Sequence, residues 1–161
     1  MQLSSKGRYA VMAMVDLAAR QAADRDGGLI CLADIAARQQ LSQSYLEQLF
    51  GKLRRAGLVG SARGPGGGYR LTRPPAEIAI ADIVLAVDES IKATRCEISS
   101  GGCMAAAAPG SYGEKCQTHD LWAELGRQIT LFLGGLTLAD VVEGSVLGRA
   151  VSVPPLPTVR N

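Results

Sequence analysis

The spacing of apolar residues along the chain predicts a mainly α-helical protein with one small β-hairpin. A first helix is expected from Ser4 or Ser5, either of which can cap it, to about Ala22, because apolar residues recur there on faces wide enough for a buried helix. The residues that define these faces are Tyr9, Met12, Ala13, Val15 and Leu17. A shorter helix is predicted over 32–38, after an apolar run at 29–31 that suits either a strand or the start of that helix.

The third predicted helix follows a turn at Leu41 and begins at Ser42, a residue type that favours helix N-caps. Its apolar positions recur at i, i+3, i+4 and i+7, and they are Leu46, Leu49, Phe50 and Leu53. Gly57 suits the end of this helix, because glycine is common just past a helix C-terminus. A short helix, a tight turn and a second helix that starts in polar residues form the helix-turn-helix pattern.

Two short apolar runs then flank a glycine-rich turn. Residues 58–59 and 69–71 have strand character, and Gly64-Pro65-Gly66-Gly67-Gly68 lies between them, which predicts a β-hairpin, or wing. This glycine segment continues into a strand rather than a helix, so it is not a phosphate-binding loop. The same helical periodicity predicts further helices around 80–87 and from about 121 to 133. Beyond Val146 the chain is rich in proline and aperiodic, which is typical of a mobile tail.

Charge is unevenly distributed along the chain. The 161 residues carry a formal net charge of only +2, yet residues 1–73 hold 11 lysines and arginines against 5 acids, and residues 74–161 hold 6 against 10. A basic first half suits a polyanion such as DNA, whereas an acidic second half does not. The sequence has no apolar run of about 18 residues, so we expect no membrane span. Because no secretory signal precedes the first helix, we expect a cytoplasmic protein.

The polar face of the third helix carries the residues that we expect to read DNA bases. Gln48 can pair with adenine, Glu47 can accept from a cytosine amino group, and Ser44 can serve either base. Phosphate contacts are expected from Lys6, Arg8, Lys52, Arg54 and Arg55. Arg63 stands just before the glycine tip of the wing, where it can enter a narrow minor groove. Tyr45, Pro65 and Gly66 complete the predicted DNA contacts.

Three of the four cysteines and the only histidine lie close together in the pattern Cys96-x6-Cys103-x12-Cys116-x2-His119. Four such ligands can close a tetrahedral zinc site or hold a small iron–sulfur cluster. In a cytoplasmic protein, thiols stay reduced, which favours metal or redox chemistry over structural disulfides. The fourth cysteine, Cys31, lies in an apolar run and is expected to be a small buried core residue.

The spacing of these ligands leaves several interpretations open. Zinc sites usually contain tight Cys-x2–4-Cys pairs, and the gaps here are wider, but a zinc-stabilised DNA-binding module remains one alternative. A disulfide switch between two of the cysteines is another. Catalysis is disfavoured, because the single histidine has no recognisable nucleophile beside it and no substrate pocket is evident. We therefore expect neither an enzyme nor a small-molecule substrate.

Six segments of the chain carry a family resemblance: SKGRYAV at 5–11, SYLEQLF at 44–50, RGPGGGY at 63–69, AVDES at 86–90, ATRC at 93–96 and KCQTHDLW at 115–122. On these segments, over about residues 1–143, the chain resembles the IscR-type iron–sulfur cluster regulators. These are dimeric winged-helix transcription factors whose wider family includes the nitric-oxide sensor NsrR. The chain departs from the family pattern at 104–112, where the stretch between two cysteines is longer than usual.

The resemblance implies a 2Fe–2S cluster held by Cys96, Cys103, Cys116 and His119. It also implies DNA contacts from Ser44, Glu47, Gln48 and Arg63, and a homodimer whose interface is the long helix after His119. The expected function is a transcriptional repressor or activator that senses iron–sulfur cluster status at pseudo-palindromic operators and controls cluster assembly genes. A nitric-oxide- or redox-sensing repressor of the same fold is the alternative.

The expected architecture has three parts. A winged helix-turn-helix DNA-binding domain is predicted at 1–75, a cluster-binding loop with dimerisation helices at 76–146, and a flexible tail at 147–161.

Overall fold

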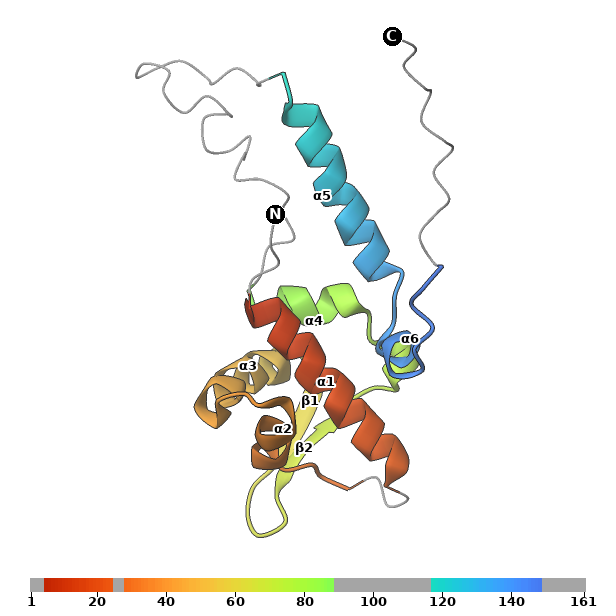
Figure 1. Cartoon of the computed structure of the whole chain (residues 1–161). Helices are drawn as coiled ribbons and strands as arrows, with labels where there is room; N and C mark the ends of the chain where they lie inside the picture. Colours follow the sequence, from red (N-terminus) through yellow and green to blue (C-terminus); the bar gives the residue numbers. More distant parts are fainter. Residues whose placement is uncertain (1–4, 25–27, 89–116, 149–161) are drawn as a thin grey trace, which may run out of the picture.

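The computed structural model describes residues 5–24, 28–88 and 117–148, and Figure 1 shows their arrangement. The described elements are α1 (Ser5–Ala23), α2 (Leu32–Gln39), α3 (Gln43–Arg55), β1 (Val59–Ala62), β2 (Gly68–Leu71), a 3-10 turn (Pro75–Glu77), α4 (Ile80–Ala86), α5 (His119–Gly134) and α6 (Leu138–Val142). The predicted cluster-binding loop with its three cysteines, and the predicted tail from residue 149 onward, lie outside the described residues.

The hydrophobic core lies between α1, the α2–α3 pair, α4 and the hairpin. The predicted apolar stripe of α3 is confirmed, because Leu46, Leu49, Phe50 and Leu53 are all buried. The largest fully buried side chains also include Met14, Leu17, Ile35, Leu58, Ile78, Ile83, Val87 and Leu138. The α1 faces were only partly predicted. Ala10, Met14 and Ala18 join the core, while Tyr9, Met12 and Val15 are half-buried, because the described residues cover only part of the apolar surface of α1.

The helix-turn-helix ends at Gly57, as predicted. The N–H of Leu58 donates to the carbonyl of Leu53 at 3.0 Å, and the N–H of Gly57 donates to the carbonyl of Arg54 at 3.0 Å. These two bonds form a Schellman motif, in which the residue after the helix takes a left-handed conformation. Gly57 has φ +73, which a glycine adopts without strain. Ser42 stands at the N-cap of α3 as expected, although its side chain makes no capping hydrogen bond.

The wing is an antiparallel hairpin in which Val59 faces Leu71 and Ala62 faces Gly68. Ile30 joins it through two backbone hydrogen bonds of 2.9 Å with Tyr69. A Cβ at Gly68 would lie 2.5 Å from the carbonyl oxygen of Ile30, so this close approach requires glycine. The apolar run at 29–31 therefore contributes a bridge to the hairpin and then the N-cap of α2.

The prediction that Cys31 is buried in the core is wrong. Cys31 is the N-cap residue of α2 and is exposed. Its neighbours Ile30 and Leu32 take the inward positions, one on the hairpin and the other in the core. An apolar run of three residues cannot show which member faces inward when the chain changes from strand to helix within it.

The C-terminal helices differ in how they pack. The short helix α6 was not predicted, because five residues are too few for helical periodicity, although Thr137 and Asp140 form a capping box at its start. Backbone hydrogen bonds from Leu138 to Ile78 and from Ile80 to Leu136 attach it beside α4. In contrast, α5 rises away from the body in Figure 1. The proposed division at residue 75 stays a prediction. Residues of α4 and Leu138 of α6 belong to the same core cluster as α1.

Candidate nucleic-acid interface and metal ligands

The polar face of α3 presents the predicted base-reading residues to solvent. Ser44, Glu47 and Gln48 are all exposed. The Nε2 of Gln43 donates to Oε1 of Glu47 at 3.0 Å, and the hydroxyls of Ser42 and Ser44 are 2.9 Å apart. Because the apolar stripe of α3 holds the opposite side of the helix in the core, these polar side chains share the outer face that a major groove can receive.

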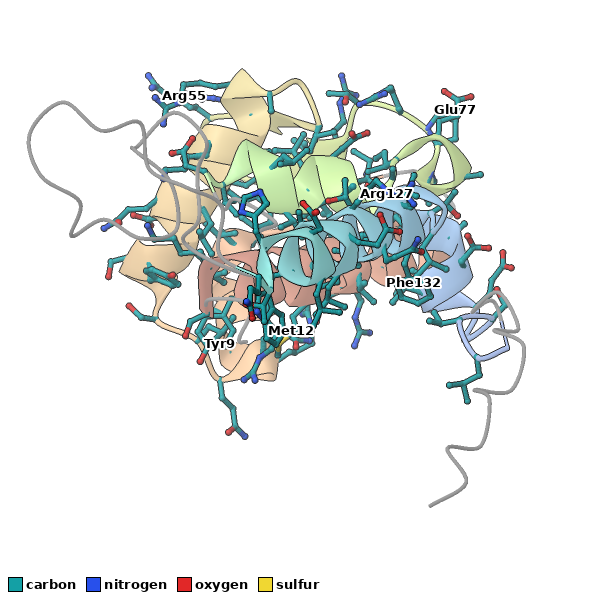
Figure 2. The ribbon with its side chains drawn as sticks, turned by 90° about the horizontal axis from the view of Figure 1, so that it is seen from above. Tyr9, Met12, Arg55, Glu77, Arg127 and Phe132 are labelled. Carbon is teal, nitrogen blue, oxygen red and sulfur yellow. The ribbon has the colours of Figure 1, made fainter. Side chains whose placement is uncertain are left out.

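An aromatic contact fixes the start of α1 beside the start of α3. The rings of Tyr9 and Tyr45 meet edge to face, with centroids 6.1 Å apart. The guanidinium of Arg8 lies 5.5 Å from the centroid of the Tyr9 ring, which is a cation–π distance. Tyr45 is half-buried in this contact, so it supports the predicted base-reading face of α3 from its edge. Tyr9 and Arg55 lie toward opposite ends of α3 in Figure 2.

Basic residues gather in the last turn of α3. Lys52 forms an ion pair with Asp88 at 2.7 Å, and Nη1 of Arg54 donates to the Ser61 hydroxyl of the wing at 3.2 Å. Nε of Arg55 donates to the carbonyl of Gly51 at 3.3 Å. Cations in the last turn also suit the negative end of the helix dipole. The sequence predicted these residues as phosphate ligands, but it could not show their protein partners.

The wing tip carries its predicted residues on the surface. Arg63, Pro65 and Gly66 are exposed. The turn closes through a hydrogen bond of 2.8 Å from the N–H of Gly67 to the carbonyl of Gly64. Because Arg54 donates a hydrogen bond to Ser61 on β1, the wing and α3 are connected by a side-chain hydrogen bond as well as by the backbone.

A buried carboxylate that sequence reasoning missed connects α1 to α2. Asp16 accepts hydrogen bonds from Nη2 of Arg38 at 2.6 Å and from Nε2 of Gln39 at 2.8 Å. Burial raises the pKa of Asp16, but the hydrogen bonds and the positive charge of Arg38 outweigh burial and lower that pKa overall. An acid within the apolar stretch of α1 was the available signal, since a buried acid requires a partner.

Of the predicted cluster ligands, only His119 belongs to the described residues. It is the first residue of α5 and is buried, with 7% of its surface exposed. Cys96, Cys103 and Cys116 lie outside the described ranges, so the structure neither brings the four ligands together nor separates them. Within the described ranges, no group of three or more potential ligand side chains is arranged to hold a metal ion.

The helix that begins at His119 exposes much of its apolar surface. Leu121, Leu131 and Phe132 are 62%, 55% and 41% exposed, and Trp122 is exposed as well. A second apolar surface lies on α1, where Val11, Met12 and Val15 line an open groove of about 520 Å³ together with Val141. Large apolar side chains left in water on one helix indicate an interaction surface.

Comparison with known proteins identifies the family. The Rrf2 family, described as iron-dependent transcriptional regulators, matches residues 3–144. The HTH-type transcriptional regulator IscR of Escherichia coli is 50% identical over 142 residues, which cover 88% of this chain and 80% of that protein. IscR of Cronobacter sakazakii is 49% identical over 142 residues, which also cover 88% of this chain and 80% of that protein. The chain belongs to the Rrf2 family.

Solved structures of related regulators agree with this assignment. The T. potens IscR structure has a TM-score of 0.68 at 34% identity and covers 90% of this chain and 88% of its own. The oxidized form of Staphylococcus aureus CymR has a TM-score of 0.66 at 33% identity, with 89% and 97% covered. The chain is thus similar to regulators of two kinds within the family.

The family assignment confirms the winged helix-turn-helix fold and the role as a DNA-binding transcriptional regulator. No helix among the described residues is long and apolar enough to cross a membrane.

Proposed function

We propose that this regulator holds a 2Fe–2S cluster on Cys96, Cys103, Cys116 and His119 and that the state of the cluster controls its binding to DNA. The target genes would include those for iron–sulfur cluster assembly, and the site of action would be the cytoplasm. The proposal is supported by the description of the family as iron-dependent and by the similarity to proteins named IscR.

The donor set carries this proposal. Three thiols and one imidazole are ligands that iron–sulfur centres accept, and they are the only cysteine–histidine cluster in the sequence. His119 is buried at the first position of α5, three residues after Cys116, so helix geometry fixes its place relative to the core. The wide cysteine gaps are less suited to a structural zinc site.

Each proposed ligand must be in a particular protonation state to hold the cluster. The three cysteines must lose their protons to ligate, and His119 must be neutral, so occupancy depends on pH as well as on iron supply. When bound, the cluster supplies one-electron redox chemistry, at a potential that an imidazole ligand raises relative to an all-thiolate set. Because His119 starts α5, any change at this ligand acts directly on the helix that exposes Leu131 and Phe132.

The proposed working form is a homodimer on a pseudo-palindromic operator. The exposed apolar residues of α5 and the α1 groove supply two apolar surfaces per chain for a two-fold interface. In a two-fold dimer of this type, two copies of α3 read half-sites about one helical turn apart. The tilt between the two copies of α5 then sets the separation of the recognition helices.

Ligand variants of the full-length protein test the proposal. Cys116→Ser and His119→Ala should each lower the iron content and the visible absorbance of anaerobically purified protein, and should change DNA binding. Cys31→Ser is the matched control, because Cys31 is exposed at the N-cap of α2 and lies in the predicted DNA-binding domain. Full retention of iron in Cys116→Ser and His119→Ala, or its loss in Cys31→Ser, would contradict the proposed ligand set.

The same variants separate the alternatives. In a thiol switch, replacement of the two pairing cysteines would abolish the response of DNA binding to oxidation, whereas His119→Ala would leave that response unchanged. A zinc module would be colourless in the wild type. A nitric-oxide sensor would hold iron, and its response would be to nitric oxide rather than to iron supply.

A further inference from the structure

An acidic side chain lies within the predicted phosphate-binding surface. Asp88 follows the C-terminal end of α4, and its Oδ2 is 2.7 Å from Nζ of Lys52 on α3. The Asp88 side chain is 76% exposed and that of Lys52 is 26% exposed, so the pair stands at the surface rather than in the core. Lys52 is one of the residues predicted to bind a DNA phosphate.

The backbone holds Asp88 in this position. Its φ is +57, in the left-handed region, and its N–H donates to the carbonyl of Leu85 at 3.1 Å. Aspartate and asparagine tolerate this conformation better than most other residues. The carboxylate is therefore presented to α3 from a defined turn, and asparagine can replace aspartate there without changing the backbone preference.

The carboxylate of Asp88 lies in the positive field of several predicted phosphate ligands. The hydrogen bond and the charge of Lys52 are the largest causes that lower the pKa of Asp88, and the charges of Arg55 and Lys6 lower it further. Asp88 is consequently ionised at neutral pH. It places a negative charge close to Lys52 and within the influence of two other cations that a DNA phosphate would use.

We propose that Asp88 competes with DNA phosphate for Lys52 and thereby lowers the affinity of the regulator for duplex DNA. This inference rests on α3 as the DNA-reading helix. A phosphate can pair with Lys52 only when the Lys52–Asp88 contact opens, and the carboxylate also repels the phosphate. Because the competition concerns a phosphate contact, it weakens binding to all sequences and leaves the preference among sequences unchanged.

The test measures binding of full-length protein to a fluorescein-labelled duplex of random sequence by fluorescence anisotropy. Asp88→Asn should bind about threefold to tenfold more tightly at about 50 mM salt, and its salt slope should be steeper by about 0.9, the value for one more neutralised phosphate. Asp82→Asn is the matched control, because Asp82 is an exposed acid on α4, the helix that Asp88 follows, and its replacement changes the net charge equally. Relative affinities for two defined duplexes should be the same in wild type and Asp88→Asn.

Lys52→Gln identifies the competing cation. It should weaken binding less than about twofold in the wild type, where Asp88 occupies Lys52, and should remove the gain in the Asp88→Asn background. Affinity of Asp88→Asn no higher than that of Asp82→Asn, or a gain that persists with Lys52→Gln, would overturn the proposal. Gln48→Ala serves as a reference for the assignment of α3 as the DNA-reading helix. If Gln48→Ala leaves the affinity for the defined duplexes unchanged, that assignment fails. If Gln48→Ala lowers this affinity but Asp88→Asn does not raise the affinity for DNA, only the role of Asp88 is refuted.

Discussion

The ion pair between the buried Asp16 and the partly exposed Arg38 offers a quantitative test of how the helix-turn-helix is held on α1. Asp16→Asn preserves the size of the side chain but removes the charge that accepts from Nη2 of Arg38 at 2.6 Å and from Nε2 of Gln39 at 2.8 Å. Only 6% of the Asp16 side chain is exposed, so water cannot replace these bonds at the carboxylate. Arg38, however, is 31% exposed and can regain some water.

The expected loss follows from these contacts. Hydrogen bonds to charged groups contribute about 1.5–3 kcal/mol each, and partial rehydration of Arg38 reduces the total. We expect Asp16→Asn to lower the free energy of unfolding by about 2 kcal/mol, which corresponds to about 4–8 °C in the thermal midpoint of a chain of this size. Urea unfolding followed by circular dichroism at a fixed protein concentration measures this loss.

The pH dependence of the loss has a definite sign. Because the pKa of Asp16 is lowered in the folded state from its ordinary value of 3.8, the ionised carboxylate stabilises the fold above that value. The advantage of the wild type over Asp16→Asn should therefore be full at neutral pH. It should shrink as the pH falls from about 4 through the lowered pKa of the folded state.

Glu124→Gln is the matched control, because it removes an equal charge from an ion pair on the surface of α5. Hydrogen bonds from Arg127 and Gln128 lower the pKa of Glu124 to about 2, yet both members of the Glu124–Arg127 pair are more than half exposed. Exposed pairs are screened by water, so the urea midpoint should not change. An equal effect of Asp16→Asn and Glu124→Gln would refute the reasoning, because Asp16 would then behave as a surface residue.

Three further predictions concern the wing, the proposed base-reading face of α3 and the proposed dimer helix α5. Gly68→Ala should destabilise the protein by about 1–3 kcal/mol, because the new Cβ would lie 2.5 Å from the Ile30 carbonyl, whereas Gly60→Ala, with its nearest contact at 3.8 Å, should be tolerated in the same thermal melt. Glu47→Ala should broaden sequence preference at low salt in a competition assay, and unchanged discrimination among duplex variants would end the idea that Glu47 selects sites. Leu131→Lys should dissociate the proposed homodimer, as measured by light scattering, while Gln128→Lys should not, and a stable Leu131→Lys dimer would exclude this face of α5 from the interface.

The periodic helices and the hairpin could be predicted because local rules govern them. The stripe at Leu46, Leu49, Phe50 and Leu53 has the helical period, and Gly57 is required where the chain turns into the wing. The residues of α3 that lie outside this buried stripe can then be assigned to its exposed face.

Features that depend on a distant partner could not be derived in this way. Asp16 on α1 accepts hydrogen bonds from Arg38 and Gln39 on α2. Lys52 on α3 forms an ion pair with Asp88, which follows α4. Cys31 has an apolar sequence context but an exposed position, because the chain changes from a bridge to a helix at that residue. The helix α5 was predicted from about residue 121 and begins at His119, whereas the burial of His119 depends on tertiary packing.

Iron and acid-labile sulfide per chain, measured on anaerobically purified full-length protein together with its electron paramagnetic resonance spectrum after reduction, test the proposed cluster most directly. The proposed 2Fe–2S cluster on three cysteines and His119 predicts two irons and two sulfides per chain and the signal of a reduced 2Fe–2S centre. One zinc per chain without sulfide, or four irons with four sulfides, would contradict it.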